Sequence, residues 1–452
     1  MKANRGWLLA VWCVGNLGAQ APGGVSYFRD IRPIIQRNCQ SCHQPAMKSG
    51  GLDLTRYESF AAGGSKGAPF NAAQPQQSLV IAYLQGTRQP RMPLGSPPLP
   101  DDQIELVRGW IAAGAKDDTP PEARDTAALG QPPTYHLPPV ITALEYSPDG
   151  SLLAVSGYRE VLLHKADGTG LAARLVGLSD RIQSLQFSRD GKTLMAAGGT
   201  PARFGEVQLW DVESRKLRHS VTLTNETVFG ASFSPDGKRV AVGCADNTVR
   251  VIDVDAGREV LKISNHENWV LGTAFGVDGK RLVSVGRDQA AKLTDAATGS
   301  FIENINAMRG ELAGIARHPT RDVILIGGGE RIPYLYMMDR PASMIIADDS
   351  TLIRKFEIQD GAIFALAFSP DGSRIAVAGA SETVPVYQTE TGERAAACKG
   401  SKGTYAIAFS PDGERLASGG FDGKVRIYEV KSGKLDRDFV PVPVETRIAT
   451  VR

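Results

Sequence analysis

The chain has 452 residues, too many for one ordinary domain, so two or three folded units are expected. Apolar residues make up 42% of it and charged residues 22%, which are the proportions of a globular protein. The formal net charge of +2 argues against nucleic acid or an anionic membrane surface as a partner.

The first 21 residues are predicted to be a signal peptide. Lys2 and Arg5 form a charged start, residues 7–17 are an apolar run, and Ala19-Gln20-Ala21 resembles a cleavage site. Cleavage after Ala19 and cleavage after Ala21 both fit the sequence. Because the apolar run is short for a membrane span, export with cleavage is favoured over an uncleaved anchor. We therefore expect an exported, periplasmic or cell-surface protein that does not span the membrane after cleavage.

Residues 25–115 predict a small helical domain. Between residues 27 and 39 the apolar side chains fall close to one helical face, at Phe28, Ile31, Ile34 and Ile35. Proline within a helix costs about 3 kcal/mol. The segment is therefore expected either to begin a helix at Arg32-Pro33 or to be a kinked helix.

Residues 39–43 read Cys-Gln-Ser-Cys-His, the spacing that attaches haem c. Two thiols on one short turn can add to the two vinyl groups of the porphyrin, and the adjacent histidine then becomes the proximal iron ligand. A zinc site would need a second pair of ligands nearby, and a thioredoxin-like site would need a βαβ context; the sequence offers neither. Cys39 and Cys42 are therefore predicted to bind one covalent haem c, with His43 as an axial ligand.

The second axial ligand is expected to be a methionine, since the next histidine is His136, well beyond this domain. Met47 follows His43 by only four residues and should stay on the same side of the ring. Met92 follows it by 92 − 43 = 49 residues, enough for the chain to return over the opposite face. Met92 is therefore the predicted ligand, and packing alone is its alternative role.

A second helix is predicted over residues 101–113. Asp101 and Asp102 suit its first turn, and its apolar stripe consists of Ile104, Val107, Trp110 and Ile111. In c-type cytochromes the first and last helices pack together beside the haem. Phe28 and Trp110 are expected to make that contact here.

Residues 28–115 resemble the planctomycete-type cytochrome c domain. The matching motifs are FRDIRPI (28–34), CQSCH (39–43), GGLDL (50–54), AAGGSKG (61–67), SLVIAYL (78–84), RMP (91–93) and WIAAGA (110–115). The resemblance implies that Cys39 and Cys42 attach the haem and that His43 and Met92 bind its iron. The family often has glycine after the haem histidine, where this chain has Gln44. It also usually has Pro-Gly before the serine of SLV, where this chain has Gln74-Pro75.

Residues 116–139 are rich in proline and polar residues and are predicted to be a linker. From residue 140 to 443 the sequence repeats. An apolar strand ending in Ser-Pro-Asp-Gly, or a variant of it, recurs with its aligned residue at Tyr146, Phe187, Phe233, Phe275, Arg317, Phe368 and Phe409. These spacings of 41 to 51 residues, with several short strands in each unit, predict a β-propeller. Residues 444–452 are left as a tail.

The repeats resemble the WD-repeat family. Trp210-Asp211 is that family's dipeptide, and the same strand reads VRVIDV (249–254), AKLTDA (291–296) and VRIYEV (425–430) in other copies. The resemblance implies seven blades. The family's Gly-His dipeptide is missing from every copy, which puts its buried Asp–His network in doubt and favours packing by apolar burial. The sequence does not indicate which strand closes the ring.

The remaining histidines and cysteines show no ligand spacing. His164, His219, His266 and His318 fall in different repeats and are expected to have surface or packing roles. Cys244 and Cys398 fall in repeats that lie far apart around the ring, and they are expected to be buried strand residues rather than a disulfide.

The predicted fold class is therefore a small all-α c-type cytochrome followed by an all-β seven-bladed WD-type propeller. The predicted function is electron transfer by a protein without a substrate site of its own, with a redox partner protein docked through the propeller. Two alternatives stay open. One is a redox enzyme whose propeller holds the active site, and the other is an interaction scaffold with a minor role for the haem.

Overall fold

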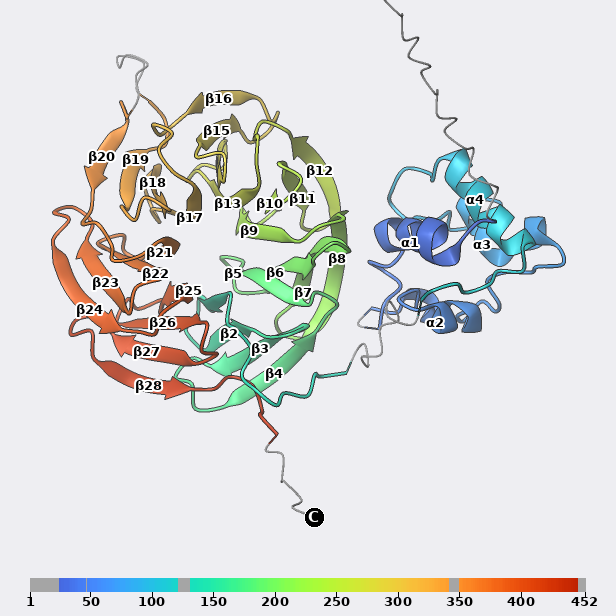
Figure 1. Ribbon diagram of the computed structural model, residues 1–452, viewed down its shortest axis with the longest axis horizontal. Coiled ribbons are helices and arrows are strands. Elements are labelled where there is room, and N and C mark those ends of the chain that lie inside the picture. Colours follow the sequence, from blue (N-terminus) through green and yellow to red (C-terminus); the bar gives the residue numbers. More distant parts are fainter. Residues whose placement is uncertain (1–23, 46, 121–130, 341–348, 446–452) are drawn as a thin grey trace, which may run out of the picture.

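The computed structural model describes residues 24–45, 47–120, 131–340 and 349–445. The predicted leader therefore lies outside the described residues, as do parts of the linker and of the tail. In the described chain, four α-helices are followed by seven four-stranded sheets arranged as blades around a ring (Figure 1). The seven-bladed propeller predicted from the repeats is confirmed, and it follows a short helical region.

The helical region begins with a π-helical turn at Tyr27–Ile31, which runs into α1 at Arg32–Asn38. The Ser26 hydroxyl accepts from the Arg29 backbone N–H at 2.9 Å and caps the turn. Pro33 lies in the first turn of α1, directly after the π-helical turn. Of the two predictions for this segment, a helix that starts at Arg32-Pro33 is confirmed.

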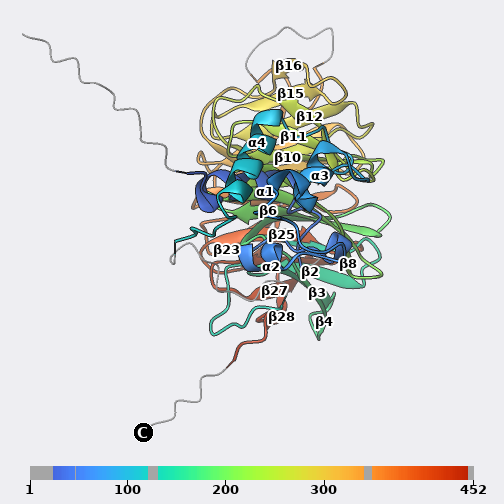
Figure 2. The same cartoon turned by 90° about the vertical axis from the view of Figure 1, so that its right-hand side faces the viewer.

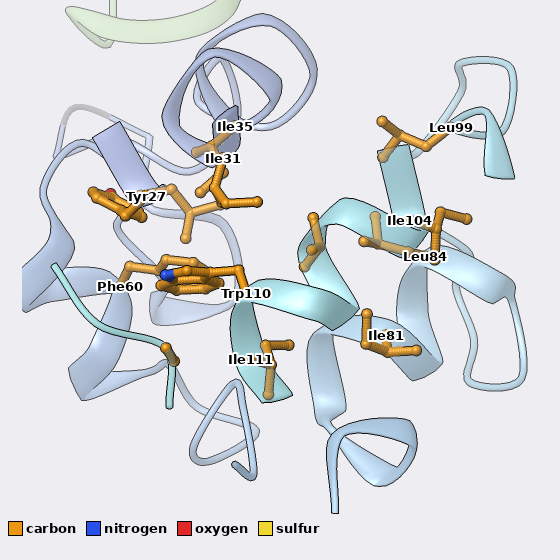
Figure 3. Close-up of a cluster of buried hydrophobic side chains, with 13 residues drawn as sticks. Tyr27, Ile31, Ile35, Phe60, Ile81, Leu84, Leu99, Ile104, Trp110 and Ile111 are labelled. Carbon is orange, nitrogen blue, oxygen red and sulfur yellow. The ribbon is translucent and has the colours of Figure 1, made fainter. Parts of the chain in front are cut away.

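The other helices are α2 (Tyr57–Ala62), α3 (Leu79–Gln85) and α4 (Asp101–Ala112). The four residues predicted as the apolar stripe of α4 are all buried. Trp110 lies at the centre of the core, with its indole ring stacked on Phe60 at a centroid distance of 6.1 Å (Figure 3).

The predicted contact between Phe28 and Trp110 is wrong. Tyr27, rather than Phe28, points into the core, and its ring centroid lies 5.4 Å from that of Trp110 (Figure 3). The π-helical turn is wider than an α-helical turn, so its residues are rotated away from the face that the α-helical spacing assumed. Phe28 is turned outward instead, where the Arg32 guanidinium lies 5.5 Å from its ring centroid.

Each blade of the propeller is built from four consecutive antiparallel strands. The blades are, in chain order: blade 1, with β1 (Leu144–Tyr146), β2 (Leu152–Ser156), β3 (Glu160–Lys165) and β4 (Leu171–Val176); blade 2, with β5 (Arg181–Phe187), β6 (Thr193–Thr200), β7 (Phe204–Asp211) and β8 (Lys216–Thr224); blade 3, with β9 (Val228–Phe233), β10 (Arg239–Cys244), β11 (Val249–Asp253) and β12 (Arg258–Ile263); blade 4, with β13 (Val270–Phe275), β14 (Arg281–Gly286), β15 (Ala291–Asp295) and β16 (Phe301–Asn304); blade 5, with β17 (Leu312–Arg317), β18 (Val323–Gly328), β19 (Tyr334–Met337) and β20 (Leu352–Lys355); blade 6, with β21 (Ile363–Phe368), β22 (Arg374–Gly379), β23 (Thr383–Gln388) and β24 (Arg394–Lys399); and blade 7, with β25 (Thr404–Phe409), β26 (Arg415–Gly420), β27 (Val425–Glu429) and β28 (Leu435–Phe439).

The Ser-Pro-Asp-Gly motif forms the turn between the first and second strands of a blade. In blade 1 the Ser147 hydroxyl donates to Asp149 at 2.5 Å and accepts from the Leu152 backbone N–H at 2.9 Å. Gly150 takes a φ of +70°, which residues with a side chain rarely adopt. The motif therefore recurs because it encodes a turn.

Burial changes across each blade from the channel to the rim. The second strand is packed between neighbouring blades, and all eight residues of β6 are buried. The fourth strand lies at the rim, where most residues of β16 and β28 are exposed. The core is thus divided among the interfaces between blades, as expected for a propeller.

Two segments close the seam between blades 1 and 7, one ahead of β1 and one beyond β28. Ahead of β1, the Ile141 backbone N–H donates to the Gly420 carbonyl at 3.0 Å. Beyond β28, Val444 forms a parallel bridge with Tyr135, and the Glu445 backbone N–H donates to the Tyr135 carbonyl at 2.8 Å. No strand is shared between blade 1 and blade 7 in the described chain, so these short contacts replace a common sheet.

The helical region lies against the rim of the propeller at blade 2. Helix α1 packs beside β8, and both views place the helices outside the ring rather than over its channel (Figures 1 and 2). Met47 packs against the core cluster of blades 1 and 2, which contains Trp210 and Leu217. The turn that carries the predicted haem cysteines is therefore followed directly by a residue anchored on the propeller.

Candidate functional site

Residues 39–43 form a compact turn directly after α1. The backbone N–H groups of Cys42 and His43 both donate to the Cys39 carbonyl, at 3.3 and 3.2 Å. The Cys42 side chain is exposed and that of Cys39 is half-buried. Both thiols therefore belong to one turn, as attachment of a planar group by two adjacent bonds requires.

His43 is held by the loop that follows it. Its Nδ1 lies 2.9 Å from the Ser49 carbonyl, and its own carbonyl accepts from the Leu54 backbone N–H at 2.8 Å. A carbonyl can only accept, so Nδ1 carries the proton, and in the neutral imidazole Nε2 carries the lone pair. A metal-binding histidine is oriented in the same way by a partner on its other nitrogen.

The surroundings of these side chains favour the neutral forms. Burial lowers the pKa of His43, against the smaller opposing effect of its backbone hydrogen bonds, so the imidazole is neutral at neutral pH. Burial raises the pKa of the Cys39 thiol to about 12. A reactive dithiol of the thioredoxin kind would instead require a lowered cysteine pKa.

The Gln44 side chain stabilises the turn by a hydrogen bond to its backbone. This side chain is fully buried, and its Nε2 donates to the Ser41 carbonyl at 3.0 Å. Its Oε1 has no hydrogen-bond donor among the described residues. The residue that departs from the glycine usual in the related family thus has a packing role directly beside His43.

Met92 and Met47 lie in different environments. Met92 is partly buried and packs against the helical core, as Cys39 does, while its backbone N–H donates to the Tyr83 carbonyl at 3.0 Å. Met47 packs against the propeller core instead. Of the two methionines, only Met92 shares a hydrophobic cluster with Cys39.

The residues present fit a covalent haem. They comprise two thiols on one turn, an imidazole oriented through its Nδ1, and a thioether held by the same core as Cys39. The Ser49 carbonyl is a part of this arrangement that sequence reasoning missed. A backbone acceptor has no sequence signal of its own, and the contact depends on how residues 43–54 close into a loop.

The propeller contains a network that resembles a catalytic triad in blade 4. His266 Nδ1 lies 2.9 Å from Asp288 Oδ2, and His266 Nε2 lies 2.7 Å from Ser284 Oγ. The histidine side chain is 0% exposed and the serine is buried, so no substrate could reach either one. The role of this network is structural.

The network also corrects an expectation drawn from the missing Gly-His dipeptide. In blade 4, Asn265-His266 takes the place of that dipeptide and supplies a buried Asp–His pair. Blade 2 has another solution, in which Glu206 accepts from Ser179, Gln208 and Ser220. Blade packing therefore does not rely on apolar burial alone.

Cys244 and Cys398 are buried as predicted, and His164 and His318 have packing roles, one of the two kinds of role expected for the other histidines. His164 and His318 are buried, and His164 Nε2 lies 2.9 Å from the Pro441 carbonyl. Cys244 and Cys398 are free and buried in β10 and β24. Within the described residues, no three His, Cys, Asp or Glu side chains gather as they would around a metal ion.

The inner strands of the seven blades enclose a central channel with a volume of about 860 Å³. Glu145 and Arg317 line it, and burial raises the pKa of Glu145 to about 8. No histidine or cysteine is among the residues lining the channel in the described chain.

Comparisons with known proteins agree with this division of the chain. Residues 39–94 match the family described as Planctomycete cytochrome C, and this range includes Cys39, Cys42, His43 and Met92. Residues 215–253, 350–388 and 392–429 match the WD domain, G-beta repeat. Each of these three ranges covers the last strand of one blade and the first three strands of the next. The chain thus joins a segment of planctomycete cytochrome c type to a WD-repeat propeller.

Two curated proteins are similar to parts of the chain. WD repeat-containing protein VIP3 of Arabidopsis thaliana is 28% identical over 140 residues, covering 28% of this chain and 43% of that protein. The U3 small nucleolar RNA-associated protein 18 homolog of Homo sapiens is 30% identical over 119 residues, covering 26% of this chain and 20% of that protein. The chain therefore spans less than half the length of either relative.

The described residues contain four α-helices, of 6 to 12 residues each. None of them is both long and apolar enough to cross a membrane.

Proposed function

We propose that this chain, which joins a cytochrome c segment to a WD-repeat propeller, is an exported single-haem c-type cytochrome that transfers electrons. The observation that carries the proposal is the turn at Cys39–His43. It presents two thiols and a histidine whose Nδ1 is already engaged by the Ser49 carbonyl.

In this proposal the helical region at 25–115 is an all-α cytochrome domain. Cys39 and Cys42 hold the porphyrin through thioether bonds, and His43 Nε2 and Met92 Sδ bind its iron. When bound, the haem supplies a one-electron iron couple whose reduction potential is raised by a thioether ligand. The polypeptide orients the imidazole through Ser49 and holds the methionine against the core.

The propeller is proposed to dock a redox partner protein. Its channel and both of its faces are left open because the helices sit at the rim (Figures 1 and 2). The WD repeats support an interaction role, and the leader at 1–21 supports a periplasmic or cell-surface location. The partner and the location are both proposals.

Covalent haem attachment can be tested on the full chain expressed in a host that matures c-type cytochromes. We expect the intact protein to bind one haem that survives denaturation, and the Cys39→Ser/Cys42→Ser variant to lose it. Cys244→Ser and Cys398→Ser are matched controls that should retain it. Loss of haem in the controls, or its absence from the intact protein, would contradict the proposal.

The axial ligands have their own spectroscopic test. Oxidised protein should be low-spin and should show the methionine-to-iron charge-transfer band, which Met92→Leu should abolish and Met47→Leu should preserve. A high-spin iron that binds carbon monoxide readily would argue against Met92 as ligand. Extraction of a second haem or a quinone would favour a redox enzyme with its active site in the propeller. Partner binding unaffected by loss of the haem would favour an interaction scaffold.

A further inference from the structure

Arg56 is a charged side chain with unsatisfied donors in the helical region. It is half-buried, and its Nε and Nη2 atoms are shielded from solvent. Among the described residues, neither nitrogen has a hydrogen-bond acceptor. The guanidinium thus presents two adjacent N–H groups with no partner supplied by the described chain.

Such an arrangement is costly in a folded protein. Leaving a buried donor unpaired costs about 1–3 kcal/mol, and a charged donor costs more. Buried cations are accordingly found with an anion beside them. The planar fork of arginine is matched best by a carboxylate, which accepts two parallel hydrogen bonds.

The nearest acidic side chains in the sequence do not fill this role. Asp53 accepts from the backbone N–H and the hydroxyl of Thr55, at 2.9 and 2.6 Å. Glu58 is exposed in the first turn of α2. The missing acceptor is therefore not a neighbouring carboxylate of the described chain.

Arg56 also lies close along the chain to the proposed haem ligand. The Leu54 backbone N–H donates to the His43 carbonyl at 2.8 Å, so the two backbones are in contact there. Arg56 follows two residues later in extended conformation, with φ −134° and ψ 154°. Two residues span at most about 7 Å of chain, so the backbone of Arg56 lies close to that of His43.

We propose that Arg56 binds a propionate carboxylate of the haem. The inference rests on the proposed function, because the haem provides the anion. A haem brings two carboxylates to the site, and the guanidinium offers the paired donors that one of them requires. Arg56 is then a positioning residue that also neutralises negative charge beside the iron.

The test compares Arg56→Gln with Arg56→Lys in the haem-loaded full chain. With the guanidinium removed, the unpaired carboxylate should stabilise ferric over ferrous haem. At the midpoint potential of the parent protein, the ferric-to-ferrous ratio of Arg56→Gln should rise roughly tenfold, because one positive charge near the iron is lost. Arg56→Lys should recover most of the change, because it keeps the positive charge. Arg88→Gln, at an exposed arginine of the same region, should match the parent.

A second readout keeps the test decisive if the substitution perturbs folding. The propionate bending mode in resonance Raman spectra should shift in Arg56→Gln and remain unchanged in Arg88→Gln. An unchanged potential and an unchanged mode in Arg56→Gln would overturn the inference, as would an equal response in Arg88→Gln. Absence of covalent haem from the parent protein would instead refute the proposed function, so the two failures are distinguishable.

Discussion

His266 forms a buried hydrogen-bond network in blade 4, although the residue before it is Asn265 rather than the glycine of the WD-repeat dipeptide. Its ring bridges Asp288 and Ser284 within the interior of blade 4. Replacing it with alanine would leave the carboxylate with the more distant Lys292 ammonium, at 3.4 Å, and with the Glu267 backbone N–H at 3.1 Å. The blade would lose a bridge between its second strand and the loop that enters it.

We expect His266→Ala to lower the free energy of unfolding by about 2 kcal/mol, because a buried carboxylate and a buried hydroxyl lose a shared partner. Urea denaturation followed by tryptophan fluorescence measures the loss. His136→Ala removes an exposed histidine from the linker and should leave stability unchanged. Equal stabilities of the two variants would contradict the structural role of the network.

The same network predicts a dependence on pH. Burial alone would raise the pKa of Asp288, but the hydrogen bond and the charge of His266 outweigh it and lower the pKa to about 2. A carboxyl group with a lowered pKa stabilises the fold above its ordinary value, near 4, and this contribution is lost as pH falls toward 2. The stability difference between the parent protein and Asp288→Asn should therefore shrink over that interval.

At the scale of elements, the sequence predicted those features that depend on local spacing. The stripe of α4, the helix start at Arg32-Pro33 and the strands β2 and β3 all follow from periodicity and turn chemistry. The π-helical turn at Tyr27–Ile31 could not be predicted from the apolar spacing. As a result, Tyr27 occupies the core position that was predicted for Phe28. Of the site, the cysteines, His43 and Met92 could be named from motifs. The His43–Ser49 contact and the proposed role of Arg56 could not, since both depend on tertiary structure.

The linker contains one residue that belongs to the propeller in structural terms. The Tyr135 hydroxyl donates to Glu160 Oε1 at 2.7 Å and accepts from the Tyr158 backbone N–H at 3.0 Å. Arg174 forms an ion pair with the same glutamate at 2.7 Å. Tyr135 thereby connects blade 1 to the chain that follows blade 7.

Tyr135→Phe should destabilise the propeller by about 1–2 kcal/mol, because the buried Glu160 oxygen loses a donor. Chemical denaturation followed by far-ultraviolet circular dichroism reports on the strands. Tyr83→Phe, in the helical region, is a matched loss of one hydroxyl and should leave that transition in place. A transition that is unchanged in Tyr135→Phe would mean that the seam is held by its other contacts alone.

At the scale of the whole molecule, Met47 links the turn at Cys39–His43 to the propeller. Met47→Glu would bring a charge into the apolar contact with the cluster around Trp210 and Leu217. We expect faster hydrogen exchange in peptides covering both α1 and β8, since these elements pack against each other. Met308→Glu places the same charge at a methionine that is 54% exposed, and it should leave both peptides unchanged. Faster exchange on one side only would show that the two regions are held together elsewhere.

The contiguity of the blades sets an order of events during synthesis. Each blade consists of strands that follow one another directly, so every sheet can pair fully as soon as its own stretch of chain has left the ribosome. The seam is the exception. Tyr135 is made before the first blade, and Val444, its partner, is made after the last. The Tyr135–Val444 contact across the seam can therefore form only after all seven blades have been made.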